Sequence, residues 1–246
     1  MAKPTVILVG ADKGGVGKTT VTRALLDYFL THNIMTRAFD TESPRGTLRR
    51  FFPDITQVVD MSAVPDQMKI FDSLGGPDSS VTVIDIRAGL LSRTLRALHE
   101  IGFLEATKKA QVNFLVFHIL GPSITSLDEI GETAGYVADG HYFLVKNFIN
   151  NTSFFEWDPA TYQNYFRRIK NAVEITIPKL DEMACEQVEL ASIPYFTFVS
   201  NRNAKGEAAQ HSFVLRGYVR HWLAQVWSEF DRVQLNDIVG VRAQAA

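Results

Sequence analysis

The sequence predicts an α/β fold, a doubly wound, mostly parallel β-sheet flanked by helices. Short apolar runs alternate with longer stretches of helical spacing, which is the pattern of βαβ units. The apolar runs are nearly continuous, which indicates strands buried on both faces, as in parallel sheets. The chain has 246 residues, of which 46% are hydrophobic, and we expect one domain over residues 1–246.

Apolar runs in the first half of the chain predict four strands. The first run is rich in β-branched residues and ends in glycine, and the fourth carries an aspartate near its end. Between the runs, apolar residues recur three and four positions apart, which predicts helices. The expected strands are Thr5–Gly10, Thr36–Asp40, Gln57–Met61 and Val81–Ile86, and the expected helices are Thr19–Leu30 and Leu90–Glu105.

The second half continues the alternation and closes on a long helix. We expect strands at Val112–Leu120, Tyr142–Lys146 and Val173–Ile177, and helices at Ser126–Ala138 and Phe213–Phe230. The last helix lies in a C-terminal helical region over about 208–234. The polar stretch Ser200–Ala209 and the aromatic-rich stretch Asn147–Asp158 are expected to be loops.

Charge and cysteine content limit the class of protein. With 25 Lys and Arg against 27 Asp and Glu, the net charge is −2, which excludes a uniformly basic DNA-coating protein but not a local basic patch. The single cysteine, Cys185, excludes an intramolecular disulfide framework and fits a reducing compartment. No apolar run approaches the ~20 residues of a membrane span. We therefore expect a cytoplasmic protein.

A glycine-rich segment follows the first expected strand and opens the first expected helix, which is the context of a phosphate-binding loop. Its glycines allow backbone N–H groups to surround phosphate oxygens, and the helix start adds the positive end of its dipole. Lys18 supplies a cation for the β- and γ-phosphates, and the Thr19 hydroxyl is a Mg²⁺ ligand. The residues expected to bind nucleotide here are Gly14, Gly15, Val16, Gly17, Lys18, Thr19 and Thr20.

The segment departs from the strict Walker A pattern, which has glycine where this chain has Asp12. It fits the deviant form Lys-Gly-Gly-x-Gly-Lys-Thr, with an additional lysine at Lys13. In this it resembles the ParA/MinD family of deviant Walker A P-loop ATPases, relatives of the nitrogenase iron protein. The resemblance implies binding of ATP and ADP with Mg²⁺ and a homodimer that sandwiches ATP. It also implies that Lys13 reaches the partner's nucleotide and acts in catalysis beside Lys18.

An acidic segment follows the second expected strand, where the family usually has Asp-x-Asp-Pro-Gln-Gly in switch I. Asp40 matches the first aspartate, and Glu42 stands in for the second. Ser43 looks like an insertion, and Arg45 replaces the glutamine. The resemblance implies that Asp40 or Glu42 positions the attacking water. A plain loop acid remains the alternative for Glu42.

The fourth expected strand ends in Asp85, which resembles the Walker B aspartate and is expected to hold Mg²⁺ together with Thr19. Gly89 follows in the position of switch II, and the resemblance implies that its N–H senses the γ-phosphate. Arg87 departs from the family pattern. Three roles are open for Arg87: its side chain contacts a phosphate, contacts an acidic side chain, or points to solvent.

Two weaker matches concern the adenine base. The segment ending in Asn147 resembles the family strand whose asparagine reads adenine, since an amide offers both a donor and an acceptor. Ile193-Pro194 resembles the family's Ile-Pro segment near the base. A turn residue is the alternative for Asn147.

Membrane binding and DNA binding would both involve the C-terminal end of the chain. The last residues are too weakly apolar and charged for a MinD-type membrane helix, so no membrane partner is expected. Residues 201–246 hold six Lys or Arg against four Asp or Glu, and Arg216 and Arg220 share one helix face. These two arginines are candidate contacts for nonspecific DNA, with an ordinary solvated face as the alternative.

Together these features predict a slow, DNA- or partner-stimulated ATPase. It would act as a dimerisation switch that partitions or positions a plasmid, chromosome or other cargo, in association with plasmid or nucleoid. A small partner protein would stimulate hydrolysis. The alternative is a nucleotide-switched adaptor in conjugative transfer or secretion, with little turnover. A metabolic amidoligase or synthetase is disfavoured because Lys13 marks the partition-type branch.

Overall fold

The computed structural model describes residues 3–74, 80–109, 111–121, 124–137, 139–149, 160, 163–164, 169 and 172–240, with the backbone alone for 124–127. In these residues seven strands form one sheet in the order β3-β2-β4-β1-β5-β6-β7, and every neighbouring pair is parallel. The strands are β1 (Thr5–Gly10), β2 (Thr36–Asp40), β3 (Thr56–Val58), β4 (Val81–Asp85), β5 (Asn113–Leu120), β6 (His141–Asn147) and β7 (Ala172–Ile177).

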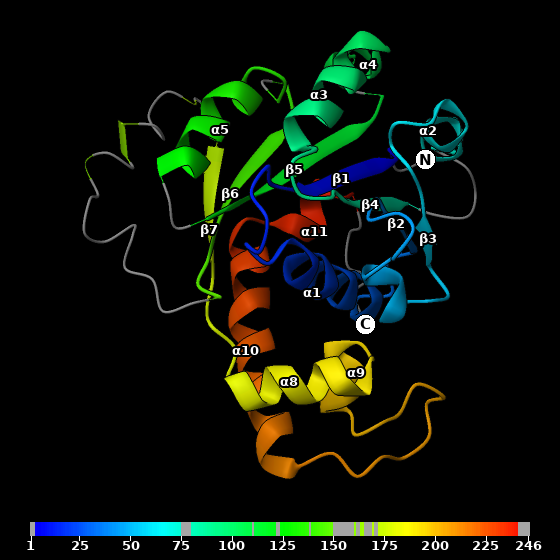
Figure 1. Cartoon of the computed structure of the whole chain (residues 1–246), viewed down its shortest axis with the longest axis vertical. Coiled ribbons are helices and arrows are strands. Elements are labelled where there is room, and N and C mark those ends of the chain that lie inside the picture. Colours follow the sequence, from blue (N-terminus) through cyan, green and yellow to red (C-terminus); the bar gives the residue numbers. More distant parts are fainter. Residues whose placement is uncertain are drawn as a thin grey trace.

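Helices cover both faces of the sheet (Figure 1). On one face lie α3 (Leu91–Glu100), α4 (Phe103–Lys108) and α5 (Ile124–Ala134), with α2 (Val64–Phe71) at the same side. On the other lie α1 (Lys18–Thr31), α10 (Phe213–Arg232) and α11 (Leu235–Ile238). Two short helices, α8 (Glu182–Ala191) and α9 (Tyr195–Val199), pack on α10, and a 3₁₀ turn spans Leu48–Arg50.

The core is split into two layers by the sheet. Along β1, Ile7 and Val9 pack toward α1 and α10, whereas Val6 and Leu8 pack toward α3 and α5. All four side chains are fully buried. This two-sided burial is the reason why the strands read as continuous apolar runs. The predicted doubly wound, mostly parallel fold is confirmed.

Several boundaries differ from the sequence prediction. The helix expected over Leu90–Glu105 is two helices, because Gly102 adopts a left-handed φ of 76° between them. The strand expected at Gln57–Met61 is the shorter β3, and the helix expected at Ser126–Ala138 is α5. Ser200–Ala209 is a loop with one isolated bridge. The expected loop at Asn147–Asp158 lies outside the described residues beyond position 149.

The topology places a ligand site before any side chain is considered. The strand β1 lies between β4 and β5, so the connections leaving the carboxyl ends of β1 and β5 run to opposite sides. Open parallel sheets bind ligands at such a switch point. Among the described helices, none is long and apolar enough to cross a membrane.

Candidate functional site

The loop between β1 and α1 is shaped by two glycines. Gly15 and Gly17 have φ values of 72° and 86°, in the left-handed region that favours glycine. A Cβ on Gly17 would lie 2.2 Å from the amide nitrogen of Asn147. Within the described chain no side chain caps the start of α1, and its first turn holds no acid. The loop therefore presents the unpaired N–H groups of a helix start, which suit an anion.

Four side chains, those of Lys18, Thr19, Thr22 and Asp85, lie close to this loop. The Thr19 hydroxyl donates to one carboxylate oxygen of Asp85 at 2.8 Å, and the Thr22 hydroxyl donates to the other at 3.1 Å. Burial and, to a lesser extent, the nearby Asp40 carboxylate raise the pKa of Asp85 to about 7, against the hydrogen bonds from Thr19 and Thr22 and the charge of Lys18. The Lys18 ammonium donates to the Lys13 carbonyl at 3.3 Å. Burial lowers the pKa of Lys18, against the opposing effect of nearby carboxylates, Asp85 first among them.

These groups line a hollow of about 300 Å³ at the carboxyl ends of β1, β2 and β4. The hollow brings together most of the residues predicted from the glycine loop, the acidic segment after β2 and the end of β4. Its lining includes Gly15, Gly17, Lys18, Thr19, Thr20, Asp40, Glu42, Asp85 and Arg87.

Asp40 lies in this lining but is engaged by its own loop. One carboxylate oxygen accepts the N–H of Glu42 at 2.9 Å, and the other accepts the N–H of Leu48 at 2.6 Å. The Glu42 carboxylate accepts the hydroxyl of Thr47. Both acids proposed to position water thus also fold the segment after β2, a role that the sequence did not predict.

The segment after β4 lies against the loop as well. The Gly89 N–H donates to the Ala11 carbonyl at 3.4 Å, and the residue has a φ of 79°. Gly89 itself is not in the lining of the hollow, whereas Arg87 is. The Arg87 backbone N–H donates to the Thr41 hydroxyl at 2.7 Å, and the residue is exposed. Arg87 thus borders both the hollow and solvent.

A second, more apolar hollow of about 360 Å³ meets the first at Thr20, which lines both. Asn147 also lines it, and its amide donates to the Val16 carbonyl at 2.8 Å. Pro178 lines it too, and its carbonyl accepts the indole N–H of Trp222 at 2.7 Å. Its walls include the apolar side chains of Ile149, Leu180 and Trp222, which suit a nucleobase, and also charged residues, namely Lys179, Glu182, Glu186 and Glu189.

Pro194 does not lie where the sequence placed it. It lines a different hollow, of about 280 Å³, beside Phe51 and Ile193. Pro178 lines the second hollow instead, because Pro178 directly follows β7 and the last residue of β7, Ile177, pairs with Asn147. Neighbouring parallel strands bring these two ends together, whereas Pro194 begins α9 after an intervening helix.

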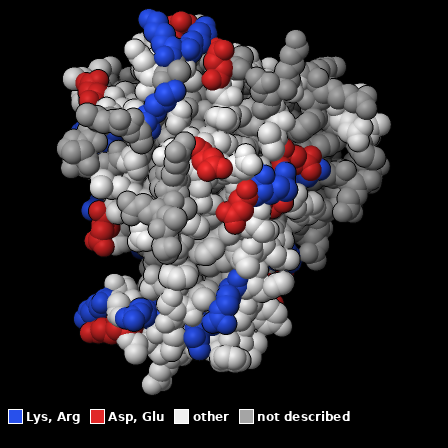
Figure 2. All heavy atoms as spheres, turned by 180° about the vertical axis from the view of Figure 1, so that it is seen from behind, with Lys and Arg blue, Asp and Glu red and all other residues white. Residues whose placement is uncertain are grey.

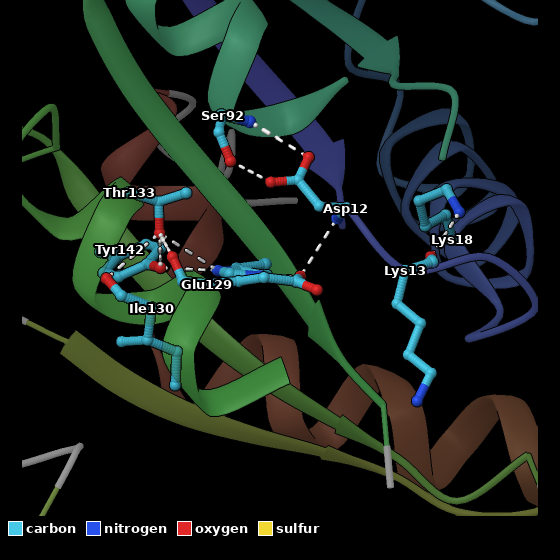
Figure 3. A network of polar contacts seen from close by, with 9 residues as sticks. Asp12, Lys13, Lys18, Ser92, Glu129, Ile130, Thr133 and Tyr142 are labelled. Carbon is cyan, nitrogen blue, oxygen red and sulfur yellow. Dashed lines mark hydrogen bonds and ion pairs between the residues drawn. The ribbon is translucent and has the colours of Figure 1, made fainter. Parts of the chain in front are cut away.

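Sequence reasoning missed a set of polar contacts around Asp12 (Figure 3). Its carboxylate accepts both the N–H of Ser92, at 3.3 Å, and the Ser92 hydroxyl. Its own N–H donates to Glu129 at 3.1 Å. The departure from the Walker glycine was the available signal, but nothing in the sequence indicated the partners. The Lys13 side chain extends away from Lys18 in the same view.

The two candidate DNA contacts differ in setting. Arg220 is exposed, whereas Arg216 is partly buried and donates to the Val199 carbonyl at 3.4 Å. Cationic and anionic side chains are interleaved on the face shown in Figure 2, where the described residues form no broad area of one sign. The local geometry therefore favours Arg220 over Arg216 as an available cation.

Metal binding would depend on the ligand itself. In the described part of the chain, no three His, Cys, Asp or Glu side chains gather in a way that holds a metal ion. Thr19 and Asp85 supply two oxygen ligands of the kind that Mg²⁺ prefers, and phosphate oxygens would have to supply others.

Comparison with known proteins places this geometry in context. No protein-family sequence model matches the chain, and no curated protein sequence does either. Solved structures do match. The septum site-determining protein MinD complexed with Mg-ADP from Pyrococcus horikoshii OT3 is 17% identical, with a TM-score of 0.57, over 98% of this chain and 99% of that one.

Two further structures agree with it. A ParA family ATPase from Chlorobium tepidum TLS is 12% identical, with a TM-score of 0.53, over 89% of this chain and 98% of that one. A nucleotide-binding protein in complex with ADP from Archaeoglobus fulgidus is 16% identical, with a TM-score of 0.50, over 75% and 85% of the two chains. The chain therefore has the P-loop α/β fold of the MinD and ParA-type proteins.

Proposed function

We propose that the chain binds Mg·ATP across the two joined hollows, hydrolyses it slowly and dimerises around it, as a ParA-like switch that positions a plasmid, chromosome or other cargo. The observation that carries this proposal is the meeting of Lys18, Thr19 and Asp85 over a glycine loop at the sheet's switch point. The Mg-ADP of the similar MinD and the ADP of the similar Archaeoglobus protein support nucleotide as the ligand class.

Each group has a defined task in this proposal. Backbone N–H groups of residues 14–19 and the Lys18 ammonium bind the phosphates. Thr19 and Asp85 hold Mg²⁺, which neutralises charge that develops on the phosphoryl oxygens. The base enters the second hollow, between Pro178 and the amide of Asn147. Glu42, or Asp40, orients the attacking water.

Dimerisation would depend on Lys13. A second lysine brought to the γ-phosphate from a partner subunit adds positive charge where the transferring group is most anionic, much as an arginine finger does. ATP would then hold two subunits together, and ADP would release them. DNA contacted by Arg220, or a small partner protein, would stimulate hydrolysis.

A second candidate is a nucleotide-switched adaptor in conjugative transfer or secretion, with little turnover. The specific observation in its favour is that Asp40 and Glu42 both accept hydrogen bonds from their own loop. A carboxylate held in this way must leave a partner before it can orient water. The adaptor would bind ATP as tightly and change its assembly state, without measurable phosphate release.

Light scattering on a sizing column, with Mg·ATP or Mg·ADP, tests the switch. We expect ATP alone to shift the wild type to a dimer, and Lys13→Ala to stay monomeric while still binding nucleotide. Lys69→Ala on α2, whose lysine pairs with Asp66, is the matched control and should dimerise normally. An assembly state that is the same in ATP and ADP contradicts the proposal.

Phosphate release with and without DNA separates the two candidates. Turnover that DNA or a partner accelerates supports the partition switch. Tight binding of ATP with no turnover under either condition supports the adaptor.

A further inference from the structure

Three hydrogen bonds clasp the segment after β4 to the phosphate loop. The Gly89 N–H donates to the Ala11 carbonyl at 3.4 Å. Two residues into α3, the N–H of Ser92 donates to one carboxylate oxygen of Asp12 at 3.3 Å, and the Ser92 hydroxyl donates to the other. The two Ser92 contacts connect residues 80 positions apart, so they fix how the start of α3 lies on the loop.

The backbone of Asp12 is in turn held by a series of polar contacts that leads into the protein interior (Figure 3). Its N–H donates to a carboxylate oxygen of Glu129 on α5 at 3.1 Å, and the same oxygen lies 3.4 Å from a ring nitrogen of His118 on β5. The other ring nitrogen lies 2.6 Å from the Tyr142 hydroxyl on β6. His118 is fully buried and Tyr142 nearly so. Because His118 and Tyr142 lie in the interior, this series of contacts anchors the backbone of Asp12 to the core.

We propose that Asp12 and Ser92 are a positioning pair that holds the segment 86–91 against the phosphate loop and keeps the Gly89 N–H on the Ala11 carbonyl. The pair thereby sets how well the site distinguishes ATP from ADP. This inference rests on the proposed nucleotide-binding function.

ATP and ADP differ in the γ-phosphate, and the two nucleotides therefore differ in their need for the segment after β4. The β-phosphate is bound by the loop and by Lys18, which both nucleotides use equally. The γ-phosphate, which only ATP carries, is expected from the family resemblance to take the Gly89 N–H, which must first leave Ala11. The clasp between Asp12 and Ser92 opposes the release of the Gly89 N–H from Ala11. It therefore weakens the binding of ATP and leaves the binding of ADP unaffected. The strict Walker glycine at position 12 has no side chain to make such a contact.

The direct test compares Kd values for a non-hydrolysable ATP analogue and for ADP, both with Mg²⁺, in Ser92→Ala and Asp12→Asn. We expect affinity for the ATP analogue to rise about tenfold in each, the factor for one hydrogen bond to a charged group, with ADP unchanged. Because both variants act on the same contact between the Ser92 hydroxyl and the Asp12 carboxylate, the double variant should gain no more than either single variant. Ser92→Thr keeps the hydroxyl and should restore the wild-type ratio.

Ser212→Ala is the matched control, because it also removes a hydrogen-bonded serine hydroxyl from a helix start, where the Ser212 hydroxyl accepts the N–H of Leu215 on α10. It should leave the ratio of the two Kd values unchanged. Thermal unfolding of every variant shows that folding is intact. A preference for the ATP analogue over ADP that is unchanged or reduced in folded Ser92→Ala, so that Kd for the ATP analogue divided by Kd for ADP is unchanged or raised, overturns the clasp. Wild-type binding of both nucleotides then leaves the proposed function standing. Wild-type protein that binds neither nucleotide overturns both.

Discussion

Asp27, on α1, is a carboxyl group whose ionisation should cost the fold stability. Its side chain is 3% exposed, and one oxygen accepts the N–H of Phe196 on α9 at 3.3 Å. Burial raises its pKa from 3.8 to about 7, while that N–H and the charge of Arg23 one turn earlier only partly oppose the effect. Replacing Asp27 with Asn keeps an oxygen for Phe196 and removes the ionisation.

The size of the effect follows from linkage. One pKa unit corresponds to about 1.4 kcal/mol, so the rise from 3.8 to about 7 amounts to about 4 kcal/mol. Because the folded pKa lies above the unfolded one, the unfolded chain releases its proton first as the pH rises. The contribution of protonated Asp27 to the free energy of unfolding is therefore fully present below about pH 4 and is lost as the pH rises to about 7.

Urea unfolding at about pH 5 and about pH 8 measures this change. The wild type should lose about 3 kcal/mol of its free energy of unfolding between these two pH values because of Asp27. The stability of Asp27→Asn should therefore rise by that amount relative to the wild type from about pH 5 to about pH 8. Asp72→Asn, at an exposed position, is the control and should show the same difference from wild type at both. An Asp27→Asn difference that does not change with pH would refute the buried-carboxyl reasoning.

Three further predictions concern the loop, the DNA face and the packing of α8. Gly17→Ala forces a left-handed alanine against the β6 amide, so we expect a loss of about 2–3 kcal/mol in urea unfolding and loss of nucleotide binding in a fluorescence titration. Arg220→Ala should weaken DNA binding, lower the slope of log affinity against log salt concentration by about one, and leave the free energy of unfolding unchanged. Arg216→Ala should instead lower the free energy of unfolding by about 1 kcal/mol. Glu189→Ala leaves the buried guanidinium of Arg23 on α1 without its carboxylate and should lower the free energy of unfolding by about 2–3 kcal/mol. Arg50→Ala removes the exposed partner of the same carboxylate and should lower it by under about 1 kcal/mol.

The sheet was predictable because its strands are buried on both faces. Continuous apolar runs leave little doubt about a parallel strand, and the glycine loop located the first strand–helix unit. The helices α2, α8 and α9 were not predicted. They are short, and exposed apolar side chains such as Val64, Met183 and Phe196 blur their periodicity. The break at Gly102 was missed because the apolar spacing continues across it.

The site was predictable where one local segment supplies the chemistry. Lys18, Thr19 and Asp85 could be placed because each lies at a strand end or a helix start. Pro178 could not be preferred over Pro194 until the pairing of β6 with β7 was known. The contact of Asp12 with Ser92 joins distant parts of the chain through side chains alone, and no spacing rule encodes it.

Calorimetric titration of Mg·ATP into the wild type and into Lys18→Ala tests the central claim most directly. We expect the wild type to bind one nucleotide per chain and Lys18→Ala to bind at least about tenfold more weakly, because a cation on the phosphates is lost. Lys69→Ala should bind as the wild type does. A wild type that binds no nucleotide, or a Lys18→Ala variant that binds it equally well, would contradict the assignment of the glycine loop as a phosphate site.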